Sequence, residues 1–205
     1  APYVKCLAVN GTDLYAAGSF TLAGGTSAQN IAKWNGASWS ALGSGTTDLI
    51  SDMVIMGSEL YAAGAFSVIG GAPAKHIARW NGSAWFPLGS GTHGDVIALA
   101  TDGTNIYAGG YFDTAGGISA IRIARWDGAN WNALDQGFDA ANTSFVKVLK
   151  WHGTDLYAIG PFTSASGVPA RGIARWDGTA WHNIPGQGLN NRVQALALQG
   201  NNLYA

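Results

Sequence analysis

Charged residues are scarce in this 205-residue sequence, at 11% of the chain, and Glu59 is its one glutamate. Helices of soluble proteins usually expose Glu, Lys and Arg, so this scarcity argues against a helical fold. The formal net charge is −1, which leaves no overall field to attract nucleic acid or an acidic membrane surface. We therefore expect no nucleic-acid partner.

The sequence has a single cysteine, Cys6, which excludes a disulfide within the chain. No apolar run approaches the roughly 20 residues that a membrane-spanning helix needs, so we expect no membrane insertion. No signal peptide is recognisable and the chain begins at Ala1 rather than Met, which favours a processed protein or a piece of a longer one.

Glycine and tryptophan are abundant instead, with 30 and 9 copies. Short apolar runs alternate with glycine-rich turns, a pattern typical of an all-β chain. A chain of this length can bury a substantial core as a single domain, residues 1–205.

The sequence repeats itself. Four segments read NIAKWNGASWSALG, HIARWNGSAWFPLG, RIARWDGANWNALD and GIARWDGTAWHNIP, and their first tryptophans lie 46, 46 and 50 residues apart. Upstream of them stand LYAAGSF, LYAAGAF, IYAGGYF and LYAIGPF. The repeats run approximately over 1–46, 47–92, 93–141 and 142–189, and residues 190–205 begin a fifth.

Each repeat contains four strand signals, which we name a to d. In the first repeat they are VKCLAV, LYAAGSF, IAKW and SWSAL, and Asn-Gly or Asp-Gly joins strands c and d in every repeat. A second tryptophan follows the first by five residues, so strand parity places both on one face of the hairpin. We predict that these pairs are structural: Trp34 with Trp39, Trp80 with Trp85, Trp126 with Trp131, and Trp176 with Trp181. A sugar-stacking surface is the alternative for these rings.

A four-stranded antiparallel sheet repeated every 46–50 residues is the signature of a β-propeller, which is the fold class we predict. The motif set LYAAGSF…AGG…NIAKWNG…W…LGSG resembles the repetitive propellers of bacterial secreted and cell-surface proteins and the related repeats of fungal cortical-marker proteins. More distantly it is similar to WD-repeat and kelch blades, although the Gly-His and Trp-Asp signatures are missing. The resemblance implies an extracellular or cell-surface, non-catalytic propeller and brings no catalytic residue.

The partial fifth repeat bears on how such a ring closes. Four complete repeats would leave residues 188–205 redundant, so we expect a ring of five or more blades. Sequence beyond Ala205 or a second copy of the chain would supply the missing strands, and exchange of the terminal segment would give a homo-oligomer.

The loops that join strands b to c and d to a vary between repeats, whereas the a–b and c–d turns are nearly uniform. Variable loops on a repeated scaffold often bind partners, although neutral drift is the alternative. The candidates for binding a protein, a polar ligand or a glycan are Lys75, His76, His93, Asp95, Arg122, Asp139, Asn142, Arg171 and Arg192. A second set of equivalent cations is Lys33, Arg79, Arg125 and Arg175, interpreted as exposed strand residues whose stems lie over tryptophan, with a repeated anion site as the alternative.

No arrangement of residues typical of an enzyme appears. The histidines at 76, 93, 152 and 182 are dispersed without metal-ligand spacing, and no nucleotide fingerprint is present, so we predict no catalytic, cofactor or metal site. Cys6 shares a strand-a position with Met53, Ala98, Val148 and Ala195 in this interpretation, which predicts a buried thiol.

The sequence therefore predicts a non-enzymatic propeller that acts as an extracellular binding or structural scaffold. A multivalent carbohydrate-binding lectin is the alternative. A lectin would repeat its site in each blade, whereas the candidate loops differ.

Overall fold

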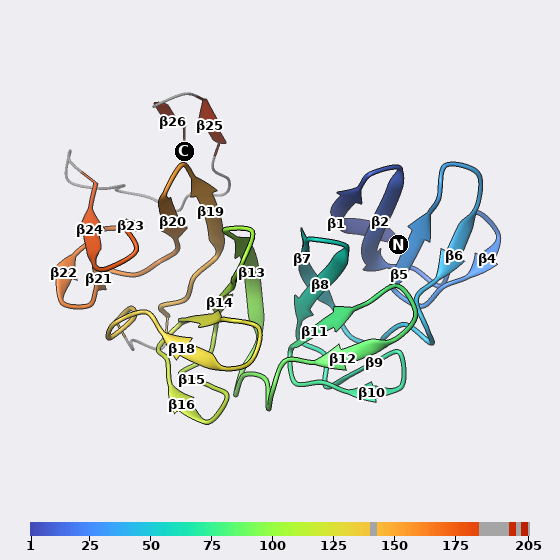
Figure 1. Ribbon diagram of the computed structural model, residues 1–205, viewed down its shortest axis with the longest axis horizontal. Helices are drawn as coiled ribbons and strands as arrows, with labels where there is room; N and C mark the ends of the chain where they lie inside the picture. The colour runs from blue at the N-terminus through green and yellow to red at the C-terminus, as the bar shows by residue number, and fades with distance from the viewer. Residues whose placement is uncertain (140–142, 185–196, 200–201, 205) are drawn as a thin grey trace. The chain divides into compact units, whose positions relative to one another are not determined.

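A computed structural model describes residues 1–139, 143–184, 197–199 and 202–204, and these residues form only strands, turns and loops (Figure 1). Four antiparallel sheets of four strands each follow one another along the chain, which confirms the predicted all-β repeat. The chain divides into two compact units, Ala1–Val96 and Ile97–Ala205. Each unit is described by itself below.

Each sheet, here called a blade, places its strands in chain order from one edge to the other. Blade 1 consists of β1 (Tyr3–Asn10), β2 (Asp13–Ser19), β5 (Ile31–Trp34) and β6 (Trp39–Ala41). Blade 2 consists of β7 (Ile50–Met56), β8 (Glu59–Gly64), β11 (Ile77–Trp80) and β12 (Trp85–Pro87). These two blades make up the first unit.

The second unit holds the other two blades. Blade 3 consists of β13 (Val96–Thr101), which starts at the unit boundary, β14 (Ile106–Gly110), β17 (Ile123–Trp126) and β18 (Trp131–Ala133). Blade 4 consists of β19 (Val148–His152), β20 (Asp155–Ile159), β23 (Ile173–Trp176) and β24 (Trp181–Asn183). A further hairpin of β25 (Ala197–Gln199) and β26 (Asn202–Tyr204) follows in the partial fifth repeat.

The connection between strands b and c contains a small hairpin in every blade, which the sequence analysis treated only as a loop. These hairpins pair β3 (Leu22–Ala23) with β4 (Thr26–Ser27), β9 (Val68–Ile69) with β10 (Ala72–Pro73), β15 (Thr114–Ala115) with β16 (Ile118–Ser119), and β21 (Ser164–Ala165) with β22 (Val168–Pro169). In the first, Gly24 and Gly25 form the two-residue turn with φ of 54° and 83°. Two consecutive positive φ angles are what a type I′ hairpin requires.

The paired tryptophans lie directly opposite one another on strands c and d, as the spacing predicted. Their ring centroids are 5.4–5.6 Å apart and their planes are tilted by 51–56°. Four residues separate the paired tryptophans, so the Asn-Gly dipeptide lies in a four-residue turn between strands c and d. Asn35 Oδ1 accepts hydrogen bonds from the amides of Ala37 and Ser38 at 3.0 and 2.8 Å, and only Gly36 has positive φ.

Two blades share one apolar core in each unit. In the first unit, Ala8, Tyr15, Ile31 and Leu42 of blade 1 form part of the same buried cluster as residues of blade 2. We call this side of a blade its leading face, defined by these residues and their equivalents, which in blade 3 are Ala100, Tyr107, Ile123 and Leu134.

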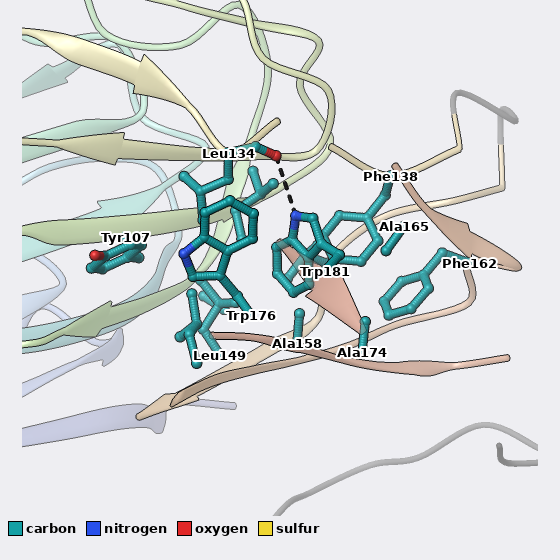
Figure 2. Close-up of a cluster of buried hydrophobic side chains, with 14 of the residues drawn as sticks. Tyr107, Leu134, Phe138, Leu149, Ala158, Phe162, Ala165, Ala174, Trp176 and Trp181 are labelled. Carbon is teal, nitrogen blue, oxygen red and sulfur yellow. Dashed lines mark hydrogen bonds between the residues drawn. The ribbon is translucent and has the colours of Figure 1, made fainter. Parts of the chain in front are cut away.

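The leading face of one blade packs against the next blade in the same unit, on the side opposite to that blade's own leading face. In blade 2 this opposite side comprises Met53, Leu60, Phe66, Trp80 and Trp85, and we call it the trailing face. Its equivalents in blade 4 are Leu149, Leu156, Phe162, Trp176 and Trp181. Figure 2 shows the second cluster, in which Trp181 and Phe162 of blade 4 lie beside Phe138 and Leu134 of blade 3. The same residue types therefore make the same interface in each unit.

Cys6 belongs to the leading face of blade 1, where it is partly buried against the core. The strand register corrects the prediction that Met53 is the blade 2 equivalent of Cys6. Cys6 pairs with Ala17 and Asp52 pairs with the equivalent Ala63, so Asp52, and not Met53, occupies the position of Cys6 in blade 2. Both strands have an irregularity one residue earlier, between Val4 and Cys6 and between Ile50 and Asp52.

Candidate functional site

The variable loops lie at one end of each blade. Strands alternate in direction, so the b–c and d–a loops share an end, and the a–b and c–d turns share the other. Main-chain hydrogen bonds tie the two variable loops together in three blades: Thr46 to Gln29 at 3.2 Å, Thr92 to Lys75 at 3.3 Å, and Phe138 to Ile121 at 3.1 Å, each from amide to carbonyl. We call this the loop end of the blade.

One position of the b–c loop has a left-handed backbone in every blade. Its residues are Asn30, His76, Arg122 and Gly172, with φ of 63°, 67°, 65° and 78°. In each blade the amide of this residue donates to a phenylalanine carbonyl, at 2.7–3.0 Å, and its carbonyl accepts from a glycine amide, at 2.9–3.2 Å. The conformation favours Gly, Asn and other residues that tolerate positive φ. Part of the sequence variation at this position therefore reflects the backbone rather than a ligand.

In the first unit the structure brings two of the predicted residues together. His76 Nδ1 lies 3.5 Å from Asp95 Oδ1, and both side chains are partly buried. Lys75 and His93 are exposed. Lys75 uses its carbonyl oxygen to bind the d–a loop, so its main chain is structural while its ammonium group faces solvent.

Asp139, in the second unit, has a structural role that the sequence analysis missed. Its carboxylate accepts hydrogen bonds from Thr163 Oγ1 at 3.0 Å, from the Thr163 amide at 3.2 Å, and from Ser144 Oγ at 3.1 Å. These bonds tie the d–a loop after blade 3 to the b–c loop of blade 4. A carboxylate so occupied has little capacity left for a partner.

Arg171 is exposed at the loop end of blade 4, and Arg122 is half-buried at the loop end of blade 3. The remaining two candidates, Asn142 and Arg192, lie outside the described residues.

The loop end of the second unit also carries an aromatic pair that the sequence analysis did not single out. Tyr111 follows β14, Phe145 precedes β19, and their rings stack with centroids 4.1 Å apart and planes at 25°. Tyr111 is 43% exposed. Its equivalents in the other blades are Ser19, Ala65 and Pro161, so a comparison between repeats identifies Tyr111 as the unusual residue.

The repeated cations at the other end of the blades pair with acidic residues of the neighbouring strand. Lys33 lies 2.6 Å from Asp13, Arg79 lies 2.6 Å from Glu59, and Arg175 lies 2.9 Å from Asp155. The prediction that the stems of these cations lie over tryptophan is wrong. The strand register places Arg79 opposite Tyr61 and Phe86. Its guanidinium lies 5.3 Å from the centroid of the Phe86 ring. In blade 3, Asn105 replaces the acidic residue.

Among the described residues, no group of three or more His, Cys, Asp and Glu side chains is arranged to hold a metal ion. The same residues include no helix with the length and apolar character of a membrane span.

No family model matches the sequence, and no curated protein matches it. Solved structures do resemble it. The extracellular domain of the B. thetaiotaomicron protein BT4673 is 12% identical, with a TM-score of 0.59 over 93% of this chain and 24% of that one. YCF48, solved with a bound D1 peptide, is 14% identical, with a TM-score of 0.57 over 98% of this chain and 60% of that one. The computationally designed protein Ika8 is 14% identical, with a TM-score of 0.58 over 98% of this chain and 66% of that one.

These neighbours are propeller-like, so the fold is that of a β-propeller with repeated four-stranded antiparallel blades. The chain spans about a quarter of the BT4673 domain and 60% of YCF48. At these identities the likeness establishes the fold alone.

Proposed function

We propose that this protein is a non-enzymatic β-propeller scaffold that binds a protein partner through the loop ends of its blades. One observation carries the proposal. The loop end keeps the same main-chain hydrogen bonds from blade to blade, while its side chains differ, from the exposed Lys75 and half-buried His76 in blade 2 to the exposed Arg171 in blade 4, where Gly172 replaces the histidine. A rigid frame with variable side chains is a common way to build a binding surface.

Among the candidate residues of blades 2 and 4, the exposed charged side chains are cationic, which favours an acidic partner at these two blades. Lys75 and Arg171 direct cationic groups to solvent, whereas Asp139 is occupied by Thr163 and Ser144. A cationic group at the edge of a binding surface speeds association with an acidic partner and adds specificity. The peptide bound to the propeller-like YCF48 supports a peptide segment as the occupant.

An extracellular or cell-surface location accompanies the proposal. It is supported by the resemblance of the repeats to those of bacterial secreted and cell-surface proteins and by the likeness to an extracellular domain. The apolar packing between blades supports a structural role for the repeated tryptophans.

The test is a selection of peptides from a displayed random library on the immobilised chain, followed by affinity measurements on variants. Lys75→Ala combined with His76→Gly removes the side chains of blade 2 while keeping its backbone, because Gly172 already occupies the equivalent position in blade 4. Arg171→Ala tests blade 4. Lys33→Gln, at the other end of blade 1, is the matched control for loss of one positive charge.

The proposal expects selected peptides to be acidic and to bind at least one loop-end variant more weakly than the wild type, with Lys33→Gln unchanged. Circular dichroism and thermal unfolding should show that the variants remain folded. Peptides that bind the wild type and both loop-end variants with equal affinity would overturn the proposal.

A carbohydrate-binding function is the second candidate, and the Tyr111–Phe145 stack favours it. The exposed ring of Tyr111, stacked on the partly buried Phe145, offers an apolar surface at a loop end on which a sugar ring can stack. The stack has no equivalent in the other blades, so it would make a single site rather than the repeated sites of a multivalent lectin. Binding on a glycan array that Tyr111→Ala abolishes would favour this function over peptide binding.

A further inference from the structure

His76 is a titratable side chain with one buried ring nitrogen. Its Nδ1 atom is shielded from solvent and has no hydrogen-bond partner among the residues that the structure describes, whereas the side chain as a whole is 19% exposed. The carboxylate of Asp95 lies beside this nitrogen, with Oδ1 at 3.5 Å. Both residues belong to the first unit, and they come from the two variable loops of blade 2.

The equivalent residue of blade 1 shows what a side chain at this position does when it cannot change its charge. Asn30 donates from Nδ2 to the Thr46 carbonyl at 2.9 Å and accepts at Oδ1 from the Phe20 amide at 3.1 Å. Its side chain therefore joins the b–c loop to the d–a loop of the same blade. His76 has the same left-handed backbone and brings its ring to the corresponding d–a loop, where it meets Asp95.

The carboxylate of Asp95 bears on which ring nitrogen of His76 carries the proton. A neutral imidazole has one N–H donor and one lone pair, and an ionised carboxylate can only accept. A lone pair on Nδ1 would therefore face a second acceptor in a position shielded from water, which is unfavourable. The arrangement favours the neutral ring that carries its proton on Nδ1, directed at Asp95, and its lone pair on Nε2.

The loops around His76 in the first unit carry further titratable groups. Lys75, its neighbour in the b–c loop, is exposed, and His93 lies with Asp95 in the d–a loop of blade 2. Asp48 is exposed in the d–a loop of blade 1, whose main chain is hydrogen-bonded to the same b–c loop. With both histidines neutral, the two carboxylates outnumber the one ammonium group. A second proton on His76 makes the two signs equal, so it favours the approach of an acidic partner.

We propose that His76 is a pH-dependent recognition group of the blade 2 loop end, in which Asp95 holds the Nδ1 proton and Nε2 faces the partner. Imidazole side chains change their charge between about pH 8 and pH 5. Neutral Nε2 offers a lone pair, which repels a carboxylate, whereas protonated Nε2 donates a charge-assisted hydrogen bond to it, next to the ammonium group of Lys75. An acidic peptide is therefore held more tightly in weak acid. This inference rests on the proposed function, because it concerns the regulation of the same loop end.

The first measurement needs no partner and uses the whole chain with 15N-labelled histidines at about pH 8. Nitrogen chemical shifts distinguish a protonated ring nitrogen from an unprotonated one, and the spectrum of His76→Asn assigns the His76 signals. His76 should carry its proton on Nδ1, and Asp95→Ala should move that proton to Nε2. His182 is the internal control, because its Nε2 lies 2.6 Å from Asp177 Oδ2 and should carry the proton there.

The second measurement compares the affinity of a selected acidic peptide at about pH 8 and pH 5.5, where its carboxylates stay largely ionised. The peptide is one that Lys75→Ala combined with His76→Gly weakens. The wild type should bind it about two- to fivefold more tightly at the lower pH, the scale of one surface ion pair.

Two asparagine variants are matched for this comparison. His76→Asn places the blade 1 residue on the same left-handed backbone and should lose most of the pH difference. His182→Asn should keep it, and it places the residue of blade 3, where Asn132 donates to Asp127 at 2.9 Å. Circular dichroism checks that both are folded, and His76→Gly replaces His76→Asn if the latter is not.

Two results would overturn the inference. One is a neutral His76 that carries its proton on Nε2, as His182 should. The other is a pH difference in affinity that His76→Asn leaves intact. The proposed function fails in a different way, through peptides that bind the wild type and the loop-end variants equally at both pH values. A peptide that the loop-end variants weaken, but that the wild type binds equally at both pH values, leaves the proposed function standing and removes the pH-dependent role of His76.

Discussion

The indole Nε1 of Trp85 in blade 2 donates a hydrogen bond of 3.1 Å to the main-chain carbonyl oxygen of Leu42 in blade 1. The second unit repeats the bond between Trp181 and Leu134 at 3.2 Å (Figure 2). Each bond crosses an apolar interface between two blades and gives the carbonyl a second donor, beside the amide of Gly45 or Gly137. The tryptophans therefore do more than fill space, because they position one blade against the next.

Replacement of Trp85 by Phe should lower the free energy of unfolding by roughly 0.5–1.5 kcal/mol, since the Leu42 carbonyl loses one of its two donors and keeps the Gly45 amide at 3.3 Å. Trp39→Phe is the matched control, because this ring makes no such bond and is partly exposed. Urea unfolding followed by circular dichroism measures both. Equal losses for the two variants would show that the hydrogen bond contributes nothing beyond ring packing.

Gly64→Ala should destabilise the first unit, because a Cβ at this position would lie 2.0 Å from the carbonyl oxygen of Leu49. The clash is with main chain, so strands β7 and β8 must move apart, at a cost of about 1–3 kcal/mol or more. Gly11→Asn is the control, with φ of +60° and no atom within 4 Å of its Cβ. A melting temperature for Gly64→Ala equal to that of Gly11→Asn would contradict the close approach.

Asp177→Asn should make the free energy of unfolding fall less steeply as the pH is lowered. Main-chain hydrogen bonds from Ala180 and Thr179, followed by the Thr179 hydroxyl and His182, hold the pKa of the Asp177 carboxyl below its ordinary value. A lowered pKa adds stability above the ordinary pKa of about 4, and this contribution is lost as pH falls through the folded-state pKa.

Asn already stands at the position of Asp177 in blades 1 and 2. Asn35 and Asn81 accept the same turn hydrogen bonds there without a charge. Asp177→Asn should therefore remain folded at pH 7. Urea unfolding between about pH 5 and pH 2 should show a shallower decline than in the wild type. A decline as steep as that of the wild type would mean that the Asp177 charge adds nothing to acid stability.

The thiol of Cys6 should react slowly in the folded protein. Burial, together with the nearby Asp52 carboxylate, raises its pKa to about 12, against the opposing charge of Lys5. Because the thiolate is the nucleophile, reaction with a maleimide at pH 8 should be slower in the native chain than in the urea-unfolded chain. Equal rates would contradict the burial of the thiol.

The same shift has a consequence at high pH. The thiol ionises near its ordinary value of 9.0 in the unfolded chain but only near 12 in the folded one, so stability declines as pH rises above about 9. Tyr61 and Tyr107 act in the same direction, since burial raises the pKa of each to about 12. Cys6→Ala should remove the thiol's part of this alkaline decline.

Sequence reasoning was strongest where the signal is local and repeated. The tryptophan pairs were predicted from a spacing of five residues, and the structure places each pair in direct cross-strand register. It was weaker at the loop end. His76 and Asp95 do approach one another, but the Asp139 carboxylate ties two loops together through Thr163, a role that the sequence did not indicate. A carboxylate looks the same in sequence whether its partner is a ligand or a threonine that lies 24 residues away.

The repeat, its four strands, the all-β class and the paired tryptophans could all be predicted from the amino-acid sequence. These follow from turn chemistry and the two-residue period of strands, which act over a few residues. The tertiary structure was needed to show that one loop position is left-handed in every blade, that Trp85 bonds to Leu42, and that Asp139 binds Thr163. Those properties depend on contacts between segments that lie far apart in the sequence, such as Trp85 with Leu42, and no local pattern records them.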